Sequence, residues 1–147
     1  MSISKCRGQK ILAFAGFSGL VTVALGAFAA HGLSHHLPEY LLGVFKTGVQ
    51  YQAWHTFALL VCGIMLMITA PNSTSQSAEY SEKGRKGVAY AGICFIIGIL
   101  CFSGSLYALA LTGIKWFGPI TPLGGVFFML GWIIFALSVL RLNKVTL

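Results

Sequence analysis

The sequence is poor in charged residues. Only 9% of its 147 residues are Asp, Glu, Lys or Arg, and three of them are acidic, whereas a soluble domain carries about 25% charged residues. Hydrophobic residues make up 56% of the chain, and the mean hydropathy is +0.82. This composition excludes an ordinary soluble enzyme and a disordered regulator, and it predicts an integral membrane protein.

The sequence also lacks paired cysteines. No two of its cysteines form a Cys-x-x-Cys motif, and three of them fall inside apolar stretches. A disulfide scaffold or a membrane thiol oxidoreductase needs cysteine pairs in polar loops. Both classes are therefore excluded. The four cysteines are Cys6, Cys62, Cys94 and Cys101.

Residue sets for catalysis are missing as well. The apolar stretches hold no carboxylate, and the sequence shows neither a phosphate-binding loop nor a nucleophile beside a base and an orienting acid. A small proton-coupled exporter is expected to keep a carboxylate inside a span, so this class is not favoured. The sequence does not favour an enzyme, and it predicts no cofactor.

Four stretches without Asp, Glu, Lys or Arg are long enough to cross a bilayer, which takes about 20 residues. They predict an all-α membrane protein with four transmembrane helices in a single domain. The first stretch is expected to be retained, because it is longer than the apolar core of about 7 to 15 residues in a secretory signal. The stretches are residues 11–33, 49–70, 88–114 and 120–140.

The positive charges lie mainly on one side of these stretches. Only Lys46 and Lys115 fall in the first and third connections, whereas the other eight Lys and Arg residues fall in the N-terminal segment, the polar loop 71–87 and the tail. The positive-inside rule therefore predicts that both termini and this loop are cytoplasmic. Because the cations flank apolar runs, membrane lipids are the expected partners, with a second copy of the chain as a candidate, and nucleic acid is not expected.

The connection between the first two stretches has helical character. Pro38 can start a helix, and three apolar residues then share one face. We expect a short interfacial helix here, bending at Gly43 or Gly48 into the second span. The alternative is a simple N-terminal extension of that span. The three apolar residues are Leu41, Leu42 and Phe45.

Small residues recur at helical spacing in three of the stretches, which predicts close helix packing. On this basis Gly104→Leu is expected to lower the stability of the bundle. The small-residue pairs are Ala15 with Gly19, Gly26 with Ala30, Cys94 with Gly98, Gly104 with Ala108, and Gly124 with Gly131.

Hydrogen-bonding side chains are expected in the outer half of the bilayer. If the second span starts at Val49, His55 lies about 9 Å below its outer end. If the third span ends at Ile114, Tyr107 lies about 10 Å and Ser103 about 16 Å from the same face.

Two interpretations of this polar layer remain open. In the first, His55 is neutral and bonded to Tyr107, Gln52 or a serine, so that it joins the second and third helices. In the second, the layer is a water-accessible cavity facing the periplasm, which binds or transports a small molecule, an ion or a lipid. The candidate ligand-binding residues are His31, Gln52, His55, Ser103 and Tyr107.

A metal site is not predicted. His31, His35 and Glu39 have the spacing of a helical metal stripe, but Gly32 and Pro38 interrupt the helix that this spacing requires. Haem ligation is also disfavoured, because nothing else in the sequence marks a haem pocket.

Four ordered motifs resemble the YgdD-like family of small bacterial inner-membrane proteins of unknown function. They are LGAFAAHG at 25–32, TGVQYQ at 47–52 with His55, FSGSLY at 102–107, and ITPLGG at 120–125. The resemblance covers nearly the whole chain. It implies a four-helix protein of the bacterial inner membrane, and it carries over no catalytic residue.

Overall fold

The structure is a computed structural model, and it describes residues 3–70, 79–142 and 144–145. Two of its helical segments, η1 and η2, are π-helical, and η3 is a short 3-10 helix. In chain order the elements are α1 (Ile3–Ala27), η1 (Phe28–Leu33), α2 (Glu39–Ile68), β1 (Glu79–Tyr80), α3 (Glu82–Gly98), η2 (Ile99–Ser103), α4 (Gly104–Thr112), η3 (Lys115–Phe117), α5 (Ile120–Leu140) and β2 (Lys144–Val145).

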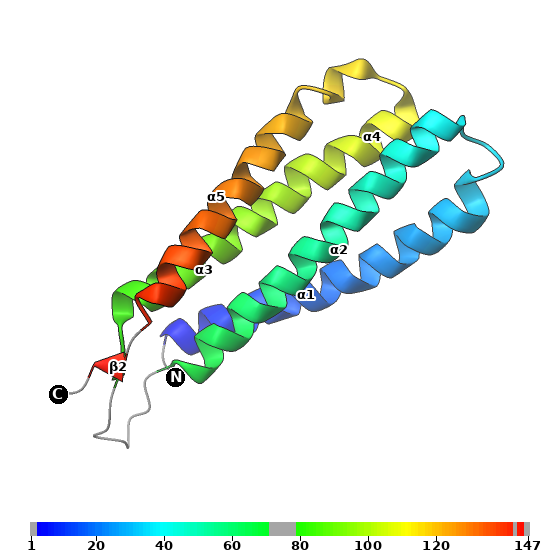
Figure 1. Cartoon of the computed structure of the whole chain (residues 1–147). Helices are drawn as coiled ribbons and strands as arrows, with labels where there is room; N and C mark the ends of the chain where they lie inside the picture. Colours follow the sequence, from blue (N-terminus) through cyan, green and yellow to red (C-terminus); the bar gives the residue numbers. More distant parts are fainter. Residues whose placement is uncertain (1–2, 71–78, 143, 146–147) are drawn as a thin grey trace.

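These elements form four long helical rods that run back and forth, with both chain ends at the same end of the bundle (Figure 1). Each rod is 26 to 31 residues long and apolar enough to cross a membrane. The predicted helical fold with four helices able to span a membrane is thereby confirmed. The four rods are Cys6–Leu33, Glu39–Ile68, Glu82–Thr112 and Lys115–Leu140.

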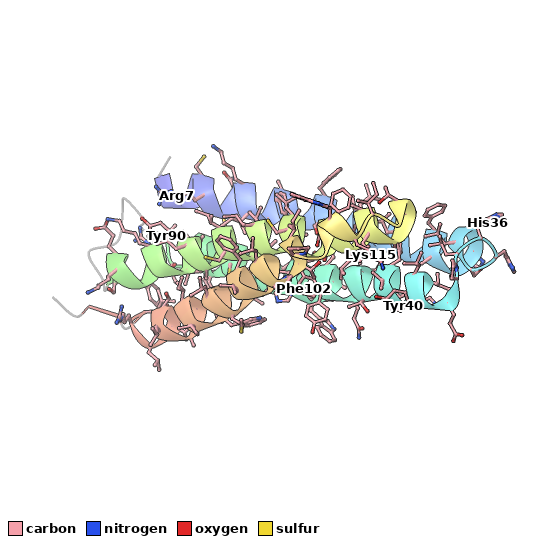
Figure 2. The ribbon with its side chains drawn as sticks, turned by 90° about the horizontal axis from the view of Figure 1, so that it is seen from above. Arg7, His36, Tyr40, Tyr90, Phe102 and Lys115 are labelled. Atoms are coloured by element: carbon pink, nitrogen blue, oxygen red, sulfur yellow. The ribbon has the colours of Figure 1, made fainter. Side chains whose placement is uncertain are left out.

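The helices pack as a series in which α2 holds a central place. α1 packs against α2, which also contacts α3 and α4, and α3 packs against α5. Figures 1 and 2 show α1 and α5 at opposite edges of the bundle. The larger core cluster includes Leu59, Phe95 and Phe128, and a smaller cluster near the α1–α2 connection includes Phe45.

The separate interfacial helix expected between the first two spans is not present. α2 runs without a break from Glu39 to Ile68, with Pro38 as its N-cap residue, so residues 39–48 extend the second span. Gly48 does not bend the helix, because it lies against Tyr107: a Cβ atom there would come within 2.7 Å of the Tyr107 ring. Glycine at this position permits close packing rather than a kink.

The third rod begins earlier than the apolar stretch alone indicates. α3 starts at Glu82, so the second half of the expected polar loop 71–87 is largely helical, while 71–78 lie outside the described residues. Glu82 and Lys86 form an ion pair of 2.7 Å one turn apart, a spacing that supports a helix. At the other end of the rod, Gly113 stops α4 with a φ of 69°.

A short strand pair joins the two segments that flank α3 and α5. β1 and β2 pair in antiparallel fashion, with Glu79 opposite Val145 and Tyr80 opposite Lys144. This pair was not predicted from the sequence. It links the start of the α3 rod to the chain that leaves α5.

Glycines on α3 and α5 let these helices approach closely. A Cβ atom on Gly98 would come within 2.4 Å of Phe128, and one on Gly131 within 2.6 Å of Phe95. At Gly124 the obstacle is backbone, because a Cβ atom would come within 2.3 Å of the Phe102 nitrogen. The stripe predicted from Gly124 and Gly131 therefore does form a helix–helix contact.

Gly104 has no such role. A Cβ atom at Gly104 would meet nothing within 4 Å, because this residue faces away from the neighbouring helices. The structure therefore gives no support to the expectation that Gly104→Leu lowers stability by blocking helix packing. Spacing alone cannot tell which small residues face a neighbour.

Candidate functional site

Gln52 joins three helices through its side-chain amide. The Tyr107 hydroxyl of α4 donates a hydrogen bond of 2.8 Å to Gln52 Oε1. On the other side, Gln52 Nε2 donates to the Ser18 carbonyl oxygen of α1 at 3.0 Å and approaches Ser18 Oγ at 3.4 Å. The Ser18 hydroxyl is in turn 2.7 Å from the Thr56 hydroxyl on α2. The amide oxygen and nitrogen thus both have protein partners.

His55 is held in one tautomer by two hydrogen-bond partners, one of which can only donate and the other only accept. Trp132 Nε1 of α5 is 3.2 Å from His55 Nε2, and an indole nitrogen can only donate. His55 Nδ1 is 2.7 Å from the Tyr51 carbonyl oxygen, which can only accept. Nε2 must therefore be the bare nitrogen and Nδ1 must carry the proton, so the arrangement fits a neutral imidazole.

Aromatic rings surround this imidazole. The His55 and Phe128 rings are stacked, with 3.4 Å between their centroids and 8° between their planes. Phe95 and Tyr51 contact the same imidazole from other sides. His55 is buried, although Trp132 is 47% exposed on the outer surface. The ring is packed as part of a core rather than presented at an open surface.

A third polar link lies at the π-helical segment η2. The Ser105 hydroxyl donates to the Phe102 carbonyl oxygen at 2.9 Å and is 2.7 Å from the Thr121 hydroxyl of α5. Because the single Ser105 proton is used on Phe102, Thr121 must donate to Ser105. This pair ties the start of α5 to α4.

The five predicted ligand-binding residues are not gathered into one site. Gln52 and Tyr107 are bonded to each other, whereas His55 is bonded to α5 and to its own helix. The prediction that His55 bonds to Tyr107, Gln52 or a serine is therefore wrong in its partner. Ser103 is buried next to Tyr107, and His31 is exposed in η1. Two hollows on the described surface are lined by other residues.

The polar groups are also spread more widely along the bundle than predicted. α2 begins at Glu39, ten residues before the span start assumed from the sequence, so His55 lies about 24 Å from the start of its helix. On α5, Thr121 and Trp132 are 11 residues apart, which is about 17 Å. The polar groups expected in one layer form a series of separate links.

Several residues of these links were not selected as candidates. Ser18, Thr56, Thr121 and Trp132 each supply a hydrogen bond between helices. Thr56 could have been predicted from the sequence, because it lies four residues after Gln52 and therefore on the same face of the helix. Trp132 could not have been predicted in this way, because α5 is apolar all round and its sequence pattern does not show which face lies toward α2.

Ser103 and Ser105 provide a direct test of these assignments. Ser103 is 1% exposed, and its hydroxyl lies beside Tyr107 without a hydrogen bond of good geometry among the described residues, whereas Ser105 has two hydrogen bonds. We expect Ser103→Ala to leave the melting temperature in detergent unchanged or slightly raised. We expect Ser105→Ala to lower the free energy of unfolding by about 1 kcal/mol. Equal losses for the two variants would contradict the assigned bonds.

These features define a class of protein: a helical integral membrane protein whose buried polar side chains bond one helix to the next. The chain belongs to the family described as "Protein of unknown function (DUF423)", whose family model matches residues 25–125.

Relatives with the same membrane assignment extend over most of the chain. A UPF0382 membrane protein of Haemophilus influenzae is 40% identical over 125 residues, which are 85% of this chain and 89% of the relative. The UPF0382 inner membrane protein YgdD of Escherichia coli K12 is 34% identical over 134 residues, or 91% and 92% of the two chains. No solved structure matches the chain. The predicted family resemblance is confirmed.

Proposed function

We propose that this chain is a non-enzymatic structural or accessory protein of the bacterial inner membrane, in which polar side chains serve to hold the helices together. The observation that carries the proposal is the use of polar atoms at Gln52 and His55: the amide oxygen, the amide nitrogen and both imidazole nitrogens bond to protein groups. A side chain whose polar atoms are already bonded inside the fold has no free hydrogen-bonding atom with which to bind a substrate.

The tautomer of His55 tests this proposal. In the protein reconstituted in lipid, nitrogen-15 NMR is expected to show one of the four histidines as a neutral imidazole protonated at Nδ1, a signal that is absent in His55→Phe. Trp132→Phe removes the donor to Nε2 and is expected to shift this signal. Detection of His55 protonated at Nε2, or as an imidazolium at neutral pH, would contradict the structural role and favour an exposed cavity.

A second candidate function is the binding or transport of a small molecule, an ion or a lipid from the periplasmic side. One observation favours it: the buried Ser103 hydroxyl lies beside Tyr107 but makes no hydrogen bond of good geometry among the described residues. His55→Ala separates the two functions. A structural His55 is expected to lower the melting temperature by several degrees, because both its hydrogen bonds and its stacking are lost, whereas a binding His55 would leave the fold intact and abolish a ligand response.

Both termini are placed in the cytoplasm in this proposal. Eight of the ten Lys and Arg residues lie in the three segments at the end of the bundle that holds the termini, as the positive-inside rule requires. The first turns of α2, with Glu39, Tyr40 and Lys46 exposed, then lie at the periplasmic interface.

Reporter fusions test this orientation. A green fluorescent protein fused after Leu147 is expected to fluoresce, and alkaline phosphatase fused at the same point is expected to be inactive. Alkaline phosphatase inserted in the α4–α5 turn serves as the matched control and is expected to be active. The reverse pattern would overturn the orientation.

A further inference from the structure

The turn between α4 and α5 has a hollow on its surface. None of the residues that line it takes part in the hydrogen bonds between helices described above. Its volume is about 420 Å³, and it is lined by Lys115, Trp116, Pro119 and Ile120. Trp116 is 86% exposed, so its side chain can be reached from outside the bundle. Figure 2 shows Lys115 on this turn and His36 farther along the bundle, in the connection between η1 and α2.

The lining combines one positive charge with three apolar side chains. The described part of the chain shows one ion pair, Glu82 with Lys86, and therefore no carboxylate that neutralises Lys115. The cation is available to an external anion. Trp116, Pro119 and Ile120 supply an apolar wall, which a small hydrated anion would not use.

The position of the hollow fits the boundary between headgroups and acyl chains. α4 ends at Thr112 and α5 begins at Ile120, so the turn joins two membrane-spanning rods at their ends. Tryptophan is enriched at this depth because its ring is apolar and its N–H is polar. A lysine here can extend its ammonium toward lipid phosphates while its stem lies along apolar surface.

We propose that this hollow binds an anionic phospholipid. The Lys115 ammonium pairs with the phosphodiester, and the glycerol and first acyl carbons pack against Trp116, Pro119 and Ile120. A lipid with a net negative charge is preferred, because the headgroup of a zwitterionic lipid carries its own cation that competes with Lys115. This site is independent of the bonds made by Gln52 and His55.

Native mass spectrometry of the purified protein tests the proposal. With equal amounts of phosphatidylglycerol and phosphatidylcholine in the micelle, wild type is expected to retain more phosphatidylglycerol, and Lys115→Gln is expected to reduce this preference about fivefold. Lys46→Gln is the matched control, because Lys46 is an exposed lysine near the start of α2 that does not line the hollow. It is expected to keep the preference of wild type.

A second variant tests the apolar wall. Trp116→Ala keeps the charge and removes the exposed ring, so it is expected to weaken retention of both lipids. Melting temperatures of all three variants are expected to match wild type, because the exposed side chains changed in them support no core. An unchanged preference in Lys115→Gln, or an equal loss in Lys46→Gln, would overturn the site. Displacement of phosphatidylglycerol by millimolar inorganic phosphate would show a free-anion site instead.

Discussion

Gly124→Ala is expected to destabilise the bundle by about 2–3 kcal/mol. The added methyl would lie 2.3 Å from the Phe102 nitrogen and 2.7 Å from its Cα, and these backbone atoms cannot rotate aside as a side chain can. The start of α5 must therefore move away from η2, which would also stretch the bond between Thr121 and Ser105. Thermal unfolding of the purified protein in detergent, followed by circular dichroism, measures this loss.

Gly104→Ala is the matched control and is expected to act in the opposite direction. Alanine is the better helix former by about 1 kcal/mol, and a methyl at Gly104 meets nothing within 4 Å. Its melting temperature is therefore expected to equal or exceed that of wild type. If Gly124→Ala melted at or above wild type, the close contact between α5 and η2 would be refuted.

Gln52→Leu is expected to lower the free energy of unfolding by about 2 kcal/mol. Leucine fills a similar volume but can neither accept from Tyr107 nor donate to Ser18. The variant thus leaves the part-buried Tyr107 hydroxyl without its acceptor and breaks the link among α1, α2 and α4. Unfolding in sodium dodecyl sulfate, compared with that of wild type, gives the difference.

The double variant isolates the bond between Gln52 and Tyr107. Tyr107→Phe alone is expected to cost about 1 kcal/mol, because it removes one donor and keeps the ring. In Gln52→Leu with Tyr107→Phe, the Tyr107 hydroxyl that would lack its acceptor is gone, so the total loss is expected to fall short of the sum of the two single losses by about 1 kcal/mol. Strictly additive losses would mean that the two side chains do not interact.

The four spanning helices could be predicted from the sequence because their physical cause is composition. A charge within a span is costly, so long uncharged stretches mark the spans directly. The start of α2 at Glu39 could not be fixed in this way, because residues 39–48 can form either a separate helix or an extension. In the structure the extension places Gly48 against Tyr107, a contact between positions 59 residues apart that the sequence does not show.

The hydrogen bonds were less accessible to prediction than the helices. Polar side chains in a span must find partners, so the involvement of Gln52, His55 and Tyr107 could be expected. Their partners depend on how each helix is rotated about its axis, and a helix that is apolar all round gives no indication of this rotation. For this reason the sequence showed neither Trp132 as the partner of His55 nor Gly104 as a residue that faces no neighbour.

The π-helical segment η2 sets the angular register of the third rod. Each residue advances an α-helix by about 100°, and a π segment holds one extra residue in its turn. Before it, α3 packs mainly against α5; after it, α4 packs mainly against α2. A one-residue deletion within η2 would restore a regular helix of almost the same length, yet it would swing the phenol of Tyr107 out of phase with Gln52. A single irregular turn thus lets one rod serve two different neighbours.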